Sequence, residues 1–422
     1  MPEIDSGDTA WLLTSSALVL FMTPGLALFY GGMVRGKNVL AMLMKNVVAM
    51  GIVTVTWIVI GYSLAFSTSG ELISIGGWGF LGNLDLFALG ELGFGKESGL
   101  GNEIQRLTIP DNAHMLFQMM FAIITPALIS GAVAERMKFS AWAIFIAIWS
   151  IIVYAPMAHW VWNSNGFIYE HLQAIDFAGG LVVHINAGAA ALALLLVLGP
   201  RLGWRRQLMR PNALPLTVLG AMILWFGWFG FNAGSALVSD GGAANAFATT
   251  QIAAAVAATA WMFAEWFVSG KPTTLGFASG AVAGLVAITP AAGFVSPLWA
   301  VVIGIAAGVI CYSALRIKFR FNFDDSLDVV AVHLVGGIVG ALLLGLFAEK
   351  AIGGVDGLFF GNPLQLLQQL AAVGIAFGYS FVLSYAIAYI LNRTMGIRVS
   401  EEEERQGLDL TLHDEQSWVL AE

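Results

Sequence analysis

Charged side chains are scarce in this chain: Lys, Arg, Asp and Glu make up 11% of its 422 residues, whereas 58% are hydrophobic. Soluble domains carry about 25% charged residues, so a chain this apolar needs lipid to cover most of its surface. An ordinary soluble protein is thereby excluded, and a membrane protein is the starting class. The net charge of −8 argues against nucleic acid as a partner, because its phosphates attract Lys and Arg.

Sulfur and reactive motifs are also scarce. The single cysteine, Cys311, excludes an intrachain disulfide and leaves too little sulfur for a thiolate metal cluster or a redox pair. No nucleophile-base or cofactor-binding pattern stands in or beside the apolar segments. The sequence therefore predicts neither an enzyme nor a resident cofactor or metal.

Long windows nearly free of Asp, Glu, Lys and Arg fill most of the chain, and only Lys45 and Glu265 fall inside them, each close to an end. A hydrocarbon core about 30 Å thick needs roughly 20 apolar residues per helix. A membrane β-barrel would need alternating polarity, which unbroken runs such as 181–198 exclude. We therefore predict an all-α membrane protein with eleven transmembrane helices. The candidate spans are 9–33, 39–66, 113–134, 139–161, 178–199, 213–237, 243–268, 273–290, 297–315, 329–348 and 363–392.

Basic residues fall almost entirely in alternate loops of this arrangement. Of the 19 Lys and Arg residues, only Lys96, Arg106 and Lys350 belong to the other set of loops. The positive-inside rule then predicts an external N-terminus and a cytoplasmic C-terminus. The expected location is the inner or plasma membrane, crossed many times, with the longest external loop near 67–111.

Eleven helices divide into five, five and one, which is the plan of an inverted repeat. We predict a transmembrane domain over 1–397, with halves at about 8–199 and 213–348 followed by the helix 363–392, and a cytoplasmic tail over 398–422. A shared pattern supports this division. Val182-Val183-His184 and Ala331-Val332-His333 each precede small residues in the last helix of a half.

His184 and His333 lie well inside apolar spans, where an imidazole needs a partner. One reading is two separate histidines, each bonded to neighbouring backbone. A metal site is less favoured, because two histidines without Cys, Asp or Glu in the same spans leave a first-row metal short of ligands. Their matched positions favour two rings that meet and share a proton.

Aromatic side chains cluster at 117–121 and 225–232, on helices expected to face the same centre. Either cluster alone is better read as core or lipid packing. Beside Trp162, on the expected external side, they indicate a cation held at an aromatic face and a narrow apolar passage leading to the histidines.

Longer motifs run through nearly the whole chain and together carry a specific resemblance. The chain resembles the ammonium transporters of the Amt/MEP/Rh family, and its Amt branch more than its Rh branch. The motifs are Pro24-Gly25 to Gly31-Gly32, Arg35 to Asn38, Gly131 to Arg136, Asp176 to Gly180, His184-Ile185-Asn186, Trp228 to Ser235, Gly280 to Gly293, Asp328 to Gly337 and Gly407-Leu408-Asp409.

This resemblance implies a homotrimer whose protomers each contain a pore. It also implies three sets of functional residues: an external recruitment site for ammonium, a phenylalanine gate below that site, and a pore below the gate. The recruitment residues would be Phe117, Phe121, Trp162, Ser235 and Asp176; the gate Phe121 and Phe231; and the pore residues His184, His333 and Trp228.

Other positions have weaker assignments. Asp176 has an equally strong alternative role as the cap of the helix that follows it. Thr289 and Asn232 resemble polar positions near the outer vestibule, and Glu135, Arg136 and Asp328 resemble residues that tie cytoplasmic loop ends together. The sequence departs from the expected pattern at Asn163-Ser164-Asn165-Gly166, where a glycine run is expected, and at Pro126, which is expected to bend its helix.

The expected function is therefore nitrogen uptake by ammonium transport, with ammonium recruited outside, deprotonated and conducted inward as ammonia. The resemblance to the Amt branch favours electrogenic transport, in which the proton follows. An ammonium sensor with the same fold is the alternative, although the sequence ends at Glu422 without a signalling domain. A passive gas channel of the Rh type is disfavoured by Trp162. A PII-type regulatory protein at the cytoplasmic face is a further expected partner, besides membrane lipid.

Overall fold

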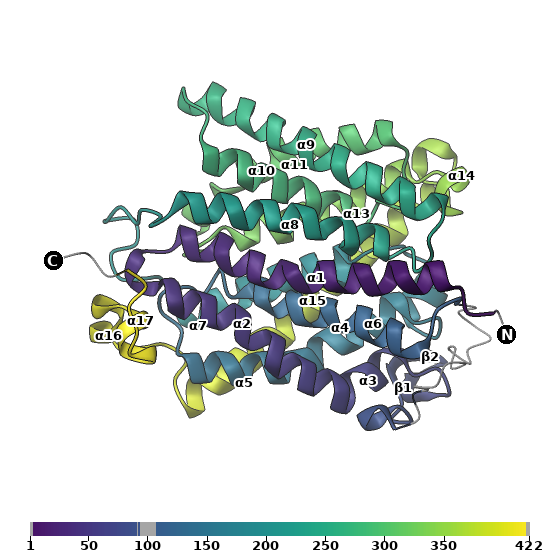
Figure 1. Cartoon of the computed structure of the whole chain (residues 1–422), viewed down its shortest axis with the longest axis horizontal. Helices are drawn as coiled ribbons and strands as arrows, with labels where there is room; N and C mark the ends of the chain where they lie inside the picture. The colour runs from purple at the N-terminus through teal and green to yellow at the C-terminus, as the bar shows by residue number, and fades with distance from the viewer. Residues whose placement is uncertain (1–2, 91, 93–106, 419–422) are drawn as a thin grey trace.

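The computed structural model describes residues 3–90, 92 and 107–418 (Figure 1). Ten of the helical segments in these ranges are long and apolar enough to cross a membrane, as the composition predicts. Five belong to the first half of the chain. They are α1 (Ser6–Met33); η1, α2, η2 and α3 (Gly36–Asn38, Val39–Thr56, Trp57–Gly61, Tyr62–Phe66); α4 (Asp111–Ile129); α5, η4 and α6 (Phe139–Trp149, Ser150–Tyr154, Ala155–Trp162); and η6 with α7 (Gly180–Ile185, Asn186–Leu198).

The other five follow in the second half. They are α8 (Leu214–Gly234), α9 (Gly241–Ser269), α11 with α12 (Pro297–Ala314, Ile317–Phe321), η7 with α13 (Val330–Leu334, Val335–Phe347) and α15 (Pro363–Thr394). The eleventh predicted span corresponds to α10 (Thr274–Ile288), which has 15 residues. At about 1.5 Å per residue it extends roughly 22 Å, less than the hydrocarbon core. The eleventh crossing therefore stays a prediction, as does the membrane orientation.

The predicted external loop contains a short antiparallel hairpin, β1 (Glu71–Ile75) with β2 (Trp78–Gly82). Gly76 and Gly77 supply the positive φ angles of 63° and 89° that a tight hairpin turn needs. The sequence analysis did not predict this hairpin, but the described chain is mostly helical, as expected. Lys96 and Arg106, which entered the orientation argument, lie outside the described residues.

The two ends of the bundle differ in what they carry (Figure 1). The hairpin end holds β1, β2 and the N-terminus, whereas the tail end holds the short helices α16 (Glu401–Gln406) and α17 (Leu408–His413). Shorter elements connect the long helices. These are η3 (Phe87–Leu89), η5 (Ile168–Leu172), α14 (Lys350–Gly353) and η8 (Leu358–Phe360).

Small residues let the long helices approach closely. α1 and α8 run side by side, and a Cβ added to Gly220 would lie 2.2 Å from the backbone nitrogen of Phe29. No side chain fits at that distance, so Gly220 is required for this contact. Small residues therefore allow the close helix packing seen at this interface.

The two histidine-bearing segments have matching local structure. His184 lies in η6 and His333 in η7, both π-helical, and each leads directly into an α-helix of 13 residues. π-Helical turns are rare and occur frequently at functional sites. This match is consistent with the predicted inverted repeat, which itself stays a prediction.

Buried ion pairs join the loops at the tail end. Arg35 Nη2 lies 2.6 Å from Glu135 Oε2, and Arg201 contacts both Glu135 at 3.3 Å and Asp324 at 2.9 Å. Burial alone would raise the pKa of Glu135, but Arg201 and Arg35 outweigh it and lower that pKa below its ordinary value. Glu135 therefore stays ionised and holds the loops together, the role expected for it.

Arg136 has the same role by other contacts. Its buried guanidinium donates to the Gly199 and Asp324 carbonyl oxygens at 2.8 and 2.7 Å and to Ser326 Oγ at 2.7 Å. These bonds tie two other loops of the tail end to the loop that bears Arg136.

The tail is docked on this end rather than hanging free. Glu404 accepts a hydrogen bond from the Leu202 backbone nitrogen at 2.6 Å and pairs with Arg398 at 2.7 Å. Asp409 accepts one from the Ala41 nitrogen at 2.8 Å, and Leu408 is fully buried. The tail thus contacts α2 of the first predicted half and the segment that links the two halves.

Gly407→Ala is expected to undock this tail. Gly407 has φ of 112°, and a Cβ there would lie 2.6 Å from both Lys37 Cβ and the Lys37 carbonyl oxygen. Hydrogen exchange of residues 400–413 should therefore increase at least about tenfold while the bundle stays protected. Gly374→Ala is the control, because a Cβ at Gly374 meets nothing within 4 Å. Unchanged exchange in Gly407→Ala would contradict a tail held by this close approach.

Candidate functional site

A cavity opens at the hairpin end, between α4, α6, α8 and the segment before η6. Its volume is about 100 Å³, well above the ~10–15 Å³ needed for one water. Aromatic and polar side chains line it together, which suits a small cation more than an apolar ligand. The lining residues are Phe66, His114, Gln118, Phe121, Trp162, Phe177, Ser235 and Leu237.

Three of the five predicted recruitment residues line this outer cavity. Phe121 and Trp162 meet edge to face, with ring centroids 5.8 Å apart at 89°. The Ser235 hydroxyl donates to the Phe231 carbonyl at 2.8 Å, which leaves its oxygen lone pairs available as acceptors. The cavity lining therefore includes two aromatic rings and a hydroxyl oxygen that can contact a cation.

Phe117 and Asp176 lie outside the cavity lining. Phe117 packs behind Phe121, with ring centroids 4.9 Å apart, and is 1% exposed. The Asp176 carboxylate accepts four backbone hydrogen bonds of 2.7 to 3.3 Å, from residues 179–182. It caps the first turn of η6, which is the alternative role considered for it from the sequence.

Asp176 also connects the cavity to the histidines. Its backbone oxygen accepts a hydrogen bond from Trp162 Nε1 at 3.0 Å, while its carboxylate fixes the start of the segment that bears His184. One residue thereby positions both the outer aromatic face and one of the two imidazoles.

Two phenyl rings separate the outer cavity from the interior. Phe121 and Phe231 have centroids 4.3 Å apart and are each 1% exposed. Beyond them lies a void of about 10 Å³, barely the size of one water, lined mainly by aliphatic and aromatic side chains together with His184 and His333. In this conformation the passage is too narrow for a hydrated ion.

The two predicted histidines do meet. Their Nδ1 atoms are 3.3 Å apart, and their rings stack at 5.3 Å and 25°. In two neutral imidazoles one Nδ1 must donate and the other accept, so one Nε2 is left as a donor and the other as an acceptor. Ammonia both donates and accepts hydrogen bonds, so it can bond to either Nε2 atom.

Trp228 holds this pair from the side. Its indole stacks on His184 at 5.5 Å, and its Nε1 donates to Thr289 Oγ1 at 2.9 Å. Thr289 in turn lies 3.3 Å from Asn232 Oδ1, and both are fully buried. Thr289 and Asn232 therefore orient Trp228 from behind and do not line the outer cavity, where the sequence analysis expected them.

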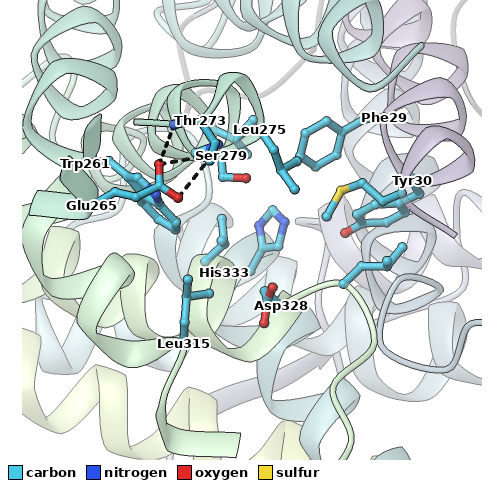
Figure 2. A pocket seen from close by; sticks show the side chains of 15 residues that line it. Phe29, Tyr30, Trp261, Glu265, Thr273, Leu275, Ser279, Leu315, Asp328 and His333 are labelled. Atoms are coloured by element: carbon cyan, nitrogen blue, oxygen red, sulfur yellow. Dashed lines mark hydrogen bonds between the residues drawn. The ribbon is translucent and has the colours of Figure 1, made fainter. Parts of the chain in front are cut away.

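A second cavity of about 110 Å³ lies on the tail-end side of the histidines. The His333 ring lines this cavity together with Asp328 and with Trp261 and Glu265 of α9 (Figure 2). Asp328 pairs with Lys318 at 2.5 Å, consistent with the loop-tying role expected for it. The two cavities and the void between them thus form a series through the bundle.

Sequence reasoning missed five residues of the outer cavity: Phe177, Leu237, Phe66, His114 and Gln118. The last two lie on the face of α4 that carries Phe121, at spacings of seven and three residues, which was the available signal. The departures noted at 163–166 are absent from the described lining of this cavity. α4 continues past Pro126 to Ile129, so this proline does not end the helix.

Comparison with known proteins agrees with this geometry. The model of the Ammonium Transporter Family matches residues 10–418. The ammonium transporter of Mycobacterium tuberculosis (strain ATCC 25618 / H37Rv) is 49% identical over 437 residues, covering 99% of this chain and 91% of the relative. That of Aquifex aeolicus is 49% identical over 420 residues, with 99% and 95% covered.

Two solved structures share the fold. The crystal structure of Candida albicans Mep2 has a TM-score of 0.86 at 36% identity, covering 95% of this chain and 88% of that one. A structure named Sensor Amt Protein has a TM-score of 0.87 at 29% identity, covering 96% and 98%. This chain is a multi-pass membrane protein that belongs to the ammonium transporter family.

Proposed function

We propose that this protein carries ammonium across the membrane through the series of cavities described above. The observation that carries the proposal is the alignment of a cation-suited cavity, a phenyl gate and a paired imidazole site. Ammonium binds at Phe121, Trp162 and Ser235, where cation–π attraction contributes about 0.5–2 kcal/mol. That is enough to concentrate the ion and weak enough to release it.

Deprotonation then separates ammonia from its proton. Moving a bare cation from water into the void between Phe231 and the histidines costs much more free energy than moving neutral ammonia there. The His184–His333 pair binds ammonia and provides a separate route for the proton, which makes the transport electrogenic. Potassium has a similar size but no proton to lose, so it is rejected at this step.

A current measurement tests the proposal. Protein reconstituted on a solid-supported membrane is expected to give a sustained current after an ammonium jump and less than about a tenth of it after a matched potassium jump. The reason is that only ammonium can cross the gate as a neutral molecule. Empty liposomes are the control, and equal currents for both ions would contradict the proposal.

A sensor is the second candidate, because one structural neighbour is named Sensor Amt Protein. Saturable ammonium binding without current, and without ammonia entry reported by a pH-sensitive dye inside the vesicles, would favour it.

The family membership also supports a homotrimer and a PII-type partner at the tail end, taken as cytoplasmic. Mass measurement of the purified protein in detergent tests the first, and pull-down with such a partner tests the second.

A further inference from the structure

Gln118 is a polar side chain of the outer cavity to which the sequence analysis gave no function. It lies one helical turn before Phe121 on α4, is 8% exposed and lines the cavity. An uncharged carboxamide at a buried position needs hydrogen-bond partners for both its oxygen and its nitrogen. Its contacts therefore decide what it offers to a ligand.

His114 satisfies only one end of this carboxamide. Gln118 Nε2 lies 3.4 Å from His114 Nε2, and His114 Nδ1 lies 3.1 Å from the Tyr62 hydroxyl. With Nδ1–H donating to Tyr62, His114 Nε2 accepts from the Gln118 nitrogen. Gln118 Oε1 then has no protein partner within the described ranges, and the atom remains accessible in the cavity.

This arrangement completes an acceptor set. An ammonium ion has four N–H bonds, and the proposed recruitment site supplies three acceptors: the faces of Phe121 and Trp162 and the Ser235 oxygen. We propose that Gln118 Oε1 is the fourth acceptor and a specificity-determining group of this site, with His114 and Tyr62 as positioning residues. The inference rests on the proposed function, since it assumes that the cavity receives ammonium.

A fourth acceptor distinguishes ammonium from its methylated analogue. Methylammonium has three N–H bonds, so it can satisfy all of them without Gln118. A missing hydrogen bond to a charged group weakens binding by about tenfold or more. Loss of the Gln118 oxygen should therefore weaken ammonium binding more than methylammonium binding.

Gln118→Leu tests this inference by removing both polar ends at similar volume. Binding of ammonium chloride and of methylammonium chloride to the purified protein is measured by titration calorimetry. We expect ammonium affinity to fall about tenfold and methylammonium affinity to fall by about threefold or less. Gln118→Glu keeps an acceptor oxygen and should bind ammonium at least as tightly as the unaltered protein.

The outcomes separate this inference from the proposed function. If the unaltered protein binds neither ion, both are wrong. If it binds ammonium but Gln118→Leu leaves the ratio of the two affinities unchanged, only the fourth acceptor is wrong. Should Gln118→Leu fail to fold, judged by its thermal unfolding, Gln118→Met replaces it and the same ratio decides.

Discussion

Asp176→Ala is expected to prevent the bundle from folding, and not merely to weaken ammonium binding. The substitution leaves four buried backbone N–H groups at 179–182 without their acceptor. Each unpaired group costs about 1–3 kcal/mol, so the total is a large part of the ~5–15 kcal/mol that stabilises a typical protein. Thermal unfolding in detergent and the recovered yield after size exclusion measure the effect.

Asp240→Ala provides the matched control. Asp240 caps α9 through two N–H groups at an exposed position, where water can replace the carboxylate. Its loss should cost only about 1 kcal/mol. Asp176→Asn keeps one acceptor oxygen and is expected to lie between these two variants. An Asp176→Ala protein of normal stability that binds ammonium poorly would instead indicate that the carboxylate acts on the cation.

Much of the bundle could be predicted because a membrane imposes a strong pattern on sequence. Ten apolar windows correspond to membrane-length helices, since each must satisfy its backbone internally in lipid. The meeting of His184 and His333 could be predicted too, because a buried imidazole requires a partner and the two share a local pattern. Both inferences depend on the cost of burying polar groups, which is insensitive to packing detail.

Features that depend on side-chain packing were harder to predict from the sequence. Hydropathy cannot tell which face of α4 lines a cavity, so Phe117 was assigned to the site while His114 and Gln118 were overlooked. Thr289 is polar like a vestibule residue, yet it lies behind Trp228 because it bonds that indole. The hairpin depends on two glycines in a loop, where the membrane pattern carries no information.

His184→Phe and His333→Phe are expected to lower the ammonium-specific current at least about tenfold while the protein stays folded. A phenyl ring can keep the stacking that His184 makes on Trp228 and Phe231, at 5.5 and 6.1 Å. The 3.3 Å contact between the two Nδ1 atoms is lost in either variant, and the one imidazole that remains has no second ring with which to share a proton. Such a bond to an ionised imidazole contributes about 1.5–3 kcal/mol, which supports this magnitude.

Met22→Leu is the control, because Met22 lines the same small void and the exchange conserves volume. Its current should stay within about twofold of the unaltered protein. An internal pH-sensitive dye adds a second measurement: if ammonia still enters vesicles containing His184→Phe without current, the pair carries the proton and the apolar passage carries the base. A full ammonium current in both histidine variants would mean that the proton crosses elsewhere, and the imidazole pair would then only fill space beside Trp228.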